Sequence, residues 1–439
     1  MKALLLRAVR LLQPQEGSAL EAVDILLEDG RVEEIGDRLP VPPGAVVVER
    51  EGCQVAPAFL DLHTHLREPG QPWKERIATA TAAAAAGGFG AICAMANLQP
   101  PVDGVARLRE CRAKNRSWER VPVLQFAAVT EQLAGLRLAP LAKLAAAGAA
   151  GFSDDGRNAL SEELLRQALE QAAVAGRPVA VHPEDEEMLA AANSWGGQDP
   201  TSWLLRPKEA EVSAVRTALE ALRRSGQGRL HLQHLSTAGA VELVRQAKLE
   251  GLAVTAEVTA HHLTLEGPLP APEARDRELT CNPPLRGEED RAALWQGLLD
   301  GTIDALASDH APHEIPTDPL ERRPPGISGV QAQLSTVLSD PRGEVGLEQV
   351  VAALTVRPHR VLGPMAGGLP EPAVREGEPA HLTVFDPKAV WRPEPGSWLS
   401  LGTNTPFWDH QLPGLVLATF SRGRVAFLRR ELGWEAELA

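Results

Sequence analysis

Between residue 59 and about residue 360, short apolar runs alternate with longer amphipathic segments, and this alternation constrains the fold more than any other feature of the chain. Short apolar runs between turn residues are typical of buried strands, whereas apolar residues spaced three and four apart indicate helices. Strands followed in turn by helices are the pattern of a (β/α)8 barrel. The runs that we predict as its eight strands lie at 59–63, 91–95, 121–129, 149–153, 178–182, 230–235, 253–258 and 303–308.

An open doubly wound sheet is the alternative fold for such an alternation. That fold binds dinucleotides through a glycine-rich loop that follows a strand and opens a helix. The glycine-rich stretch of this chain, Gly87–Gly90, precedes a predicted strand instead, so we prefer the barrel. Its helices are expected at 73–86, 105–116, 131–147, 161–175, 209–224, 238–250 and 288–299.

The two ends of the chain carry short alternating runs broken by turn sequences, which predict strands of a different kind of domain. Neither end has strands enough for a stable core, so we expect them to fold together as a small β-sandwich domain. The predicted domains are this composite unit, residues 1–52 with 365–439, and a catalytic barrel at 53–364. The terminal strands are expected at 4–9, 22–27, 45–48, 380–385 and 415–421.

Composition narrows the class of function. A net charge of −14 argues against a nucleic-acid binder, which needs a basic face to displace counterions. No stretch approaches the roughly 18 to 20 apolar residues that span a bilayer, and Arg7 interrupts the apolar run at the start of the chain. The four cysteines are scattered, without a Cys-x-x-Cys pair. We therefore expect a cytoplasmic protein that acts on a small molecule, with no nucleic-acid or membrane partner.

Side chains that bind metals gather at the predicted strand ends, where the reactive groups of such a barrel sit. His63 and His65 lie two residues apart at the end of the first strand, so their side chains point to the same side. Structural histidines would not favour one rim, so this pattern predicts a metal site, and ligands without thiolates suit Zn2+ or another borderline divalent ion. The further candidates follow four more strands, at Asp154-Asp155, His182, His234 and Asp309-His310.

Several of these residues also have simpler interpretations. In isolation, the stretch 154–156 is typical of a turn, and Asp309 with His310 could cap a helix. His231 lies three residues before His234, so we expect it to face the surrounding helices and not the metal site.

The candidate residues fall within six stretches of the chain, at 59–70, 152–156, 182–185, 233–237, 282–286 and 308–313. In this order the stretches resemble the motifs of the bacterial type I dihydroorotases of the amidohydrolase superfamily, and the resemblance extends over about residues 50 to 430. It implies an enzyme of de novo pyrimidine biosynthesis that reversibly cyclises N-carbamoyl-L-aspartate to L-dihydroorotate.

The resemblance implies two zinc ions per subunit. Asp155 would bridge them, since many relatives use a carboxylated lysine and this chain has no lysine between Lys143 and Lys208. Asp309 would also act as general acid and base, taking a proton from the hydroxide that the two metals share and returning it to the leaving ring nitrogen. The six implied ligands are His63, His65 and Asp309 on one ion, His182 and His234 on the other, and the bridging Asp155.

The same resemblance implies which residues hold the substrate. The pyrimidine ring would contact Asn282, Pro325 and Gly326, and the loop 314–325 is a candidate lid. The chain departs from the family pattern at four positions: Ala58 replaces the usual Gly, Ala96 and Ala260 each replace a Pro, and Pro183 replaces a Cys. Ala96 directly precedes Asn97, so this change affects the expected orientation of Asn97. The residues implied to bind the free carboxylate are Arg67, Asn97 and His313.

Two other functions are compatible with parts of this sequence. Hydantoinases and dihydropyrimidinases share barrel and metals, but they typically use a lysine bridge and a tyrosine at the reacting oxygen, and this chain has no tyrosine. A non-catalytic scaffold for aspartate transcarbamoylase would be expected to lose metal ligands, whereas all six are present. Dihydroorotase is therefore preferred, and both a complex with aspartate transcarbamoylase and a homo-oligomer are compatible with it.

Overall fold

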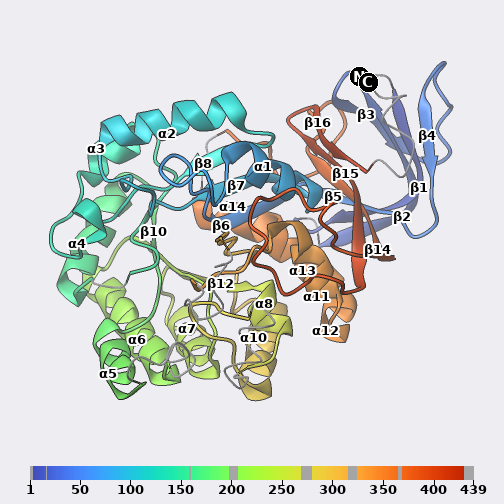
Figure 1. Cartoon of the computed structure of the whole chain (residues 1–439). Coiled ribbons are helices and arrows are strands. Elements are labelled where there is room, and N and C mark those ends of the chain that lie inside the picture. Colours follow the sequence, from blue (N-terminus) through green and yellow to red (C-terminus); the bar gives the residue numbers. More distant parts are fainter. Residues whose placement is uncertain are drawn as a thin grey trace.

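Eight short strands form a barrel within the described part of the chain (Figure 1). The structure is a computed structural model, and it describes residues 3–15, 17–157, 160–196, 206–267, 279–314, 324–363 and 368–429. Every strand overlaps one of the eight predicted runs. The strands are β6 (Phe59–Thr64), β7 (Phe89–Ala94), β8 (Val123–Gln125), β9 (Phe152–Ser153), β10 (Pro178–Val181), β11 (Arg229–Leu232), β12 (Val254–Thr259) and β13 (Ala305–Ala307).

The pairing of these strands closes the barrel. β6 to β8 pair in parallel as one sheet, and β9 to β13 pair in parallel as another. Isolated parallel bridges then join the two sheets along both edges, one between Ala127 and Phe152 and one between Thr64 and His310. All carboxyl ends of the strands therefore meet on one rim, as the fold requires.

Helices lie between the strands and surround them (Figure 1). Local sequence explains individual ends: the side chain of Ser161 caps α4 by accepting from the backbone of Leu164, and Gly226 ends α6 in the left-handed conformation. The helices are α1 (Ile77–Ala86), α2 (Val105–Trp118), α3 (Leu141–Ala146), α4 (Glu162–Val174), α5 (Glu186–Gly196), α6 (Lys208–Ser225), α7 (Ala238–Leu249), α8 (Ala260–Thr264), α10 (Glu288–Asp300), α11 (Gln333–Leu338), α12 (Pro341–Val345), α13 (Leu347–Leu354) and α14 (Val356–Leu362).

One predicted helix, at 131–147, is wrong in its first half. Only a short 3-10 turn, η1 (Glu131–Leu133), forms there, and α3 begins at Leu141. Gly135 favours a turn, and Pro140 lacks the N–H group that a helix interior needs, so the two residues divide the segment.

Strands from both ends of the chain form one sheet beside the barrel (Figure 1). β14 pairs antiparallel with β5, with Val384 opposite Val55, and this pairing joins the C-terminal strands to the N-terminal ones. The predicted fold class, a barrel with a small β-sandwich built from both ends, is confirmed; the domain limits at residues 52 and 365 stay a prediction. The strands are β1 (Leu4–Gln13), β2 (Ser18–Glu28), β3 (Arg31–Gly36), β4 (Val46–Glu49), β5 (Gln54–Pro57), β14 (Leu382–Trp391), β15 (Leu412–Ser421) and β16 (Arg424–Leu428).

The sheet rests on the amino ends of the first barrel strands. Phe59 and Phe89, the first residues of β6 and β7, pack edge to face with ring centroids 5.7 Å apart, and Phe385 of β14 lies 6.2 Å from Phe59. The hydroxyl of Ser421 donates to the carbonyl of Gly90 at 2.8 Å. This apolar junction lies at the opposite end of the strands from the rim that carries the metal-type side chains.

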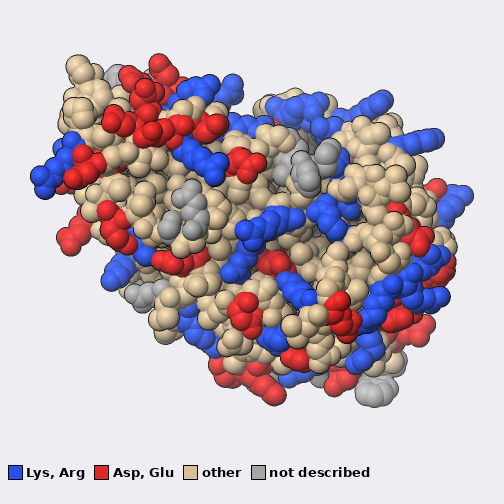
Figure 2. Space-filling model, turned by 180° about the vertical axis from the view of Figure 1, so that it is seen from behind, with Lys and Arg blue, Asp and Glu red and all other residues tan. Residues whose placement is uncertain are grey.

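Acidic and basic side chains are intermixed over the face of the molecule that Figure 2 shows. Among the helices of the described ranges, none combines the length and the apolar character needed to cross a membrane.

Candidate metal centre

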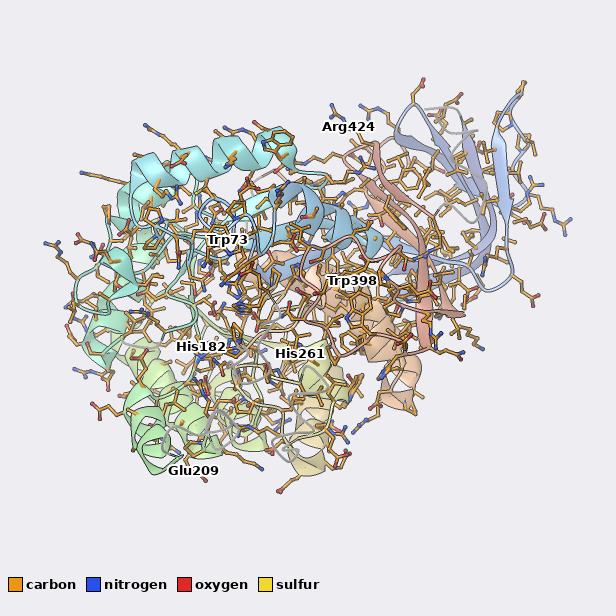
Figure 3. All side chains as sticks on the ribbon, in the orientation of Figure 1. Trp73, His182, Glu209, His261, Trp398 and Arg424 are labelled. Atoms are coloured by element: carbon orange, nitrogen blue, oxygen red, sulfur yellow. The ribbon has the colours of Figure 1, made fainter. Side chains whose placement is uncertain are left out.

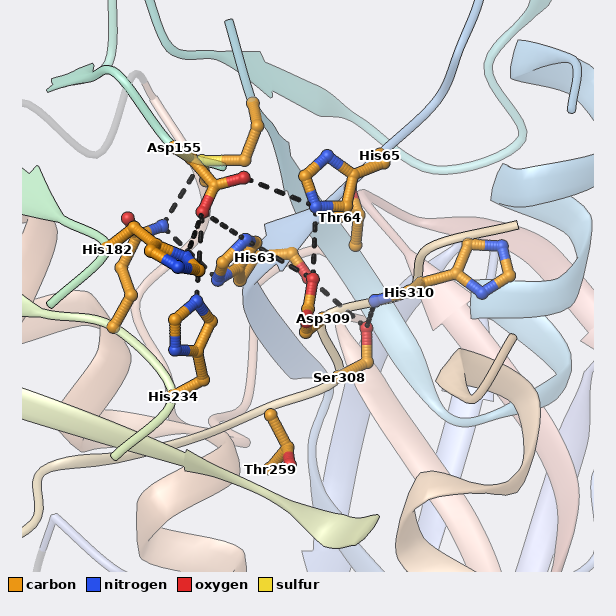
Figure 4. Close-up of polar contacts among 12 residues, drawn as sticks. His63, Thr64, His65, Asp155, His182, His234, Thr259, Ser308, Asp309 and His310 are labelled. Atoms are coloured by element: carbon orange, nitrogen blue, oxygen red, sulfur yellow. Dashed lines mark hydrogen bonds and ion pairs between the residues drawn. The ribbon is translucent and has the colours of Figure 1, made fainter. Parts of the chain in front are cut away.

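Six side chains from five strand ends converge on one point at the carboxyl rim of the barrel (Figure 4). All are buried, with exposed fractions of 7% or less. Each follows or ends a different strand, apart from the pair on β6, so the barrel itself brings them together. They are His63 and His65 from β6, Asp155 after β9, His182 after β10, His234 after β11 and Asp309 after β13.

The carboxylate of Asp155 lies at the centre of this group (Figure 4). Its Oδ1 is 3.3 Å from Nε2 of His63, 3.7 Å from Nδ1 of His182 and 3.8 Å from Nε2 of His234. Its Oδ2 is 3.4 Å from Nε2 of His65. One carboxylate thus touches four imidazole rings, the position expected of a group that is shared between two ions.

Asp309 faces the same rings from the other side. Its Oδ1 lies 3.0 Å from Nε2 of His65 and 3.4 Å from Nε2 of His63. Two sets of donor atoms therefore lie close enough to share an ion, and both include His63: one with His65 and Asp309, the other with Asp155 and His234. His182 belongs to neither set, although it contacts Asp155.

These donors fit a metal ion. Four ligands at about 2.0–2.2 Å from a tetrahedral zinc lie roughly 3.4 Å apart, close to the separations found here. Nε2 of the fully buried His63 lies between the carboxylates of Asp155 and Asp309 but has no well-oriented hydrogen bond to either, and a buried polar atom in this state is costly unless something else binds it. The site also attracts positive charge. Burial alone would lower the pKa of His182, but the contacts with Asp155 and Glu184 outweigh burial and raise this pKa to about 9.

The ring nitrogens that face away from the centre are also held. Glu257 of β12 binds Nδ1 of His63 at 2.7 Å, and Glu184 binds Nε2 of His182 at 2.9 Å. Such contacts set the tautomer and orientation of a metal-binding histidine. Neither glutamate was predicted from sequence; the available signal for Glu257 was a lone carboxylate within an otherwise apolar strand.

His231 contradicts its sequence expectation, whereas Asp154 matches the simpler of its two interpretations. His231 does not face the helices: its Nε2 binds the second oxygen of Glu257 at 3.0 Å, inside the barrel wall next to His63. Asp154, the first of the aspartate pair, accepts from the backbone of Val129 and Thr130 at 2.7 and 3.0 Å. It holds a turn, as its simpler interpretation suggested, while Asp155 enters the site.

A cavity of about 160 Å³ opens over the centre, and its wall contains every residue implied to bind substrate. A larger groove of about 540 Å³ lies between α6 and α7 and contains none of them. The cavity is lined by His65, Arg67, Asn97, Asp155, Gly156, His182, His234, Asn282, Asp309, Ala311, His313, Pro325 and Gly326. The candidate lid at 314–325 lies, between residues 315 and 323, outside the described residues.

Arg67 and His313 form a pair in this wall. Nη2 of Arg67 lies 3.0 Å from Nε2 of His313, and its Nε donates to the carbonyl of Pro312 at 3.2 Å. Burial lowers the pKa of Arg67 to about 10, so it stays charged at neutral pH. Burial and the charge of Arg67 lower the pKa of His313 to about 3, so this ring is neutral and accepts from the arginine.

Asn97 forms hydrogen bonds with two of the metal-type residues. Its Oδ1 lies 2.9 Å from Nδ1 of His65, and its Nδ2 donates to the carboxylate of Asp155 at 3.2 Å. The side chain therefore orients His65, and its implied contact with a substrate carboxylate stays a prediction. Asn282 lines the cavity with a buried Oδ1 that has no partner.

Comparison with known proteins identifies the family. Residues 54–426 match the sequence profile of the Amidohydrolase family. A dihydroorotase of Anaeromyxobacter dehalogenans (strain 2CP-C) is 38% identical over 406 residues, which cover 91% of this chain and 92% of that protein. A dihydroorotase of Pelobacter propionicus is 36% identical over 431 residues, 97% of this chain and 100% of that protein.

Among solved structures, an L-hydantoinase (dihydropyrimidinase) from Arthrobacter aurescens superposes with a TM-score of 0.83 at 24% identity, over 97% of this chain and 96% of that one. At this identity the likeness establishes the fold only. Taken with the curated relatives, it leads to one conclusion: the chain belongs to the amidohydrolase family and, within it, to the dihydroorotases.

Proposed function

We propose that this chain is a dihydroorotase, which interconverts N-carbamoyl-L-aspartate and L-dihydroorotate in de novo pyrimidine biosynthesis. The observation that carries the proposal is Arg67, a half-buried cation in the wall of the metal cavity. Within the described residues, no ion pair joins it to a carboxylate, and its hydrogen bonds go to a carbonyl and a neutral ring. A partly desolvated arginine without an ion-pair partner gains most from a carboxylate, so its position favours a substrate that brings its own.

We propose that zinc completes the centre and that the six converging side chains would hold two ions, with Asp155, which contacts four of the imidazole rings, as the residue that would serve both. When bound, such ions polarise the amide carbonyl of the substrate and lower the pKa of a water molecule. The residues around them set the orientation: Glu257, Glu184 and Asn97 hold the far nitrogens of three of the histidines.

Asp309 is assigned the proton transfer. In hydrolysis the oxygen of water bonds to the ring carbonyl carbon, the bond from this carbon to the ring nitrogen breaks, and the nitrogen gains a proton. Burial alone would raise the pKa of Asp309, but the nearby His63 and His65 outweigh it and hold this pKa well below its usual range. An ionised carboxylate accepts the proton of water and delivers it to the nitrogen. Ring closure follows the same steps in reverse.

The cellular setting belongs to the same proposal. We place the enzyme in the cytoplasm, in keeping with four cysteines that are all free and buried in the structure. A complex with aspartate transcarbamoylase and a homo-oligomer stay predictions.

Hydrolysis of a neutral ring, hydantoin or dihydrouracil, is the alternative function. A neutral ring bound in the cavity would leave the charge of Arg67 without a carboxylate partner, so a site built around this residue should reject such rings strongly. A scaffold without catalysis is disfavoured, since the six metal-type side chains lie within contact of one another.

One experiment separates these functions. The purified protein is analysed for zinc by plasma emission and assayed with dihydroorotate, carbamoyl aspartate, hydantoin and dihydrouracil. We expect about two zinc ions per chain, turnover of the first pair in both directions, and activity on the neutral rings lower by at least about 10³-fold. Preference for a neutral ring, or a zinc-loaded protein without activity, would overturn the proposal.

A further inference from the structure

The segment between β14 and β15 leaves the composite sheet and reaches the substrate side of the barrel. Trp398 in this segment lies on the side of the barrel that faces the sheet (Figure 3). Its indole N–H donates to the carbonyl of Gly402 at 2.9 Å and so closes a compact turn. Beyond this turn the chain carries Asn404, which is 4% exposed.

Asn404 makes four hydrogen bonds with its side chain. Its Oδ1 accepts from the backbone N–H of His313 at 2.9 Å and from the hydroxyl of Ser328 at 2.9 Å. Its Nδ2 donates to the carbonyl of Ala311 at 3.0 Å and to that of Gly326 at 2.8 Å. Two accepted and two donated bonds use the full capacity of an amide side chain.

Three of the four partners of Asn404, namely Ala311, His313 and Gly326, belong to two strips of backbone that line the metal cavity, and Ser328 lies two residues beyond Gly326. One strip runs from Asp309 to His313, and the other contains Gly326. These strips also touch each other: the N–H of Ala311 donates to the carbonyl of Ile327 at 3.0 Å. Asn404, which does not itself line the cavity, therefore fixes the distance between two of its walls.

Independent contacts hold the segment in this place. Glu75, which is fully buried, accepts hydrogen bonds from the hydroxyl of Ser400, from the N–H of Leu401 at 3.3 Å and from His310 at 3.1 Å. A Cβ added to Gly402 would overlap Pro312 and Ser328. The close approach needs glycine there for lack of space.

We propose that Asn404 is a positioning residue of the substrate site, through which the C-terminal segment sets the pocket for the substrate carboxylate. The inference rests on the proposed function, because it concerns the pocket of Arg67 and His313. His313 hydrogen-bonds Arg67 with its ring and Asn404 with its backbone, so the arginine and the C-terminal segment are joined through one residue.

Only asparagine satisfies all four partners at this position. An aspartate would turn two donated bonds into contacts between a carboxylate and the carbonyls of Ala311 and Gly326. An alanine would leave two buried carbonyls, one N–H and one hydroxyl without their partner, a loss that destabilises the local arrangement. Both changes should loosen the strips around His313 and Gly326, whereas none of the four bonds that are lost involves a metal-type side chain.

The test compares Asn404→Ala and Asn404→Asp with Thr403→Ala. Thr403 is the exposed neighbour on the same segment, and within the described residues its hydroxyl makes no hydrogen bond, so it serves as the matched control. For each zinc-loaded enzyme, KM and kcat are measured with dihydroorotate, zinc is counted, and the binding of orotate, a flat ring with the same carboxylate, is titrated by calorimetry.

We expect both Asn404 variants to raise KM and the Kd for orotate about 10-fold or more, to lower kcat less, and to keep their zinc. The Thr403 variant should match the wild type. Unchanged KM and orotate affinity in the folded variants would overturn the proposal. A loss of orotate affinity that is fully explained by a loss of bound zinc would also overturn it. If neither variant folds, Asn404 supports the fold and not the site, and the proposal fails. An inactive wild type would instead refute the proposed function.

Discussion

Glu257 binds Nδ1 of His63 at 2.7 Å and thereby leaves Nε2 of this histidine as the nitrogen that faces the metal centre. Burial alone would raise the pKa of Glu257, but His63 and His231 lower it to about 2, so the carboxylate is ionised at neutral pH. A negative charge behind an imidazole makes its other nitrogen a stronger ligand. Because His63 takes part in both sets of donor atoms within this centre, Glu257 influences the whole centre.

Replacing this charge should weaken metal binding. For Glu257→Gln we expect zinc affinity to fall about 10- to 100-fold, with activity recovered at excess zinc. Competition with a chelator of known affinity measures the change. Glu242→Gln, on the exposed face of α7, is the matched control. Zinc affinity equal to that of the wild type would show that the contact between Glu257 and His63 is only structural.

Asp309→Asn should separate proton transfer from metal binding. An amide does not take up a proton from water at neutral pH, so we expect kcat for dihydroorotate to fall by about 10² to 10⁴-fold or more. Turnover is expressed per bound zinc, because Asp309 also faces His63 and His65 and its loss can lower occupancy. Near-normal turnover per zinc would refute the catalytic role of this residue.

The sequence predicted the parts of this site that depend on local pattern. His63 and His65 share a side because a strand alternates, and Asp309 was placed by the rule that strand ends meet on one rim. The same rule pointed to the pair Asp154 and Asp155, and only the family resemblance selected Asp155. These predictions need only the alternation of side chains along each strand and the order of the strands, and both can be recognised in short stretches of sequence.

The remaining parts depend on contacts between distant segments. Asn404 meets His313 across 91 residues, and Glu257 meets His63 across 194. A lone carboxylate in a strand does not reveal its partner, since the partner depends on how neighbouring strands are staggered. His231 was misjudged for the same reason, and the helix predicted at 131–147 failed because Pro140 outweighed helical spacing.

Arg67→Met should weaken the grip on the substrate carboxylate. We expect KM for dihydroorotate to rise about 10- to 100-fold, as the loss of hydrogen bonds to a charged group predicts, with zinc content unchanged. Activity on dihydrouracil, which has no carboxylate, should not fall in parallel. Arg76→Met is the control, since Arg76 is an exposed arginine nearby on the same loop. Loss of zinc in the Arg67 variant would assign it a structural role instead.

His381, buried at the junction of sheet and barrel, should make the fold sensitive to acid. Burial, together with His359 and Arg422, lowers the pKa of its ring to about 3 from an ordinary 6.5. Between these values the unfolded chain binds a proton that the folded chain does not, so stability is lost as pH falls below about 6.5. The loss reaches about 2 kcal/mol at pH 5.

Urea unfolding at pH 7 and at pH 5 measures this loss. The His381→Leu variant should lose less stability over this range than the wild type, whereas a variant at an exposed histidine, His410→Leu, should follow the wild type. Parallel pH profiles for all three proteins would show that His381 does not carry this sensitivity.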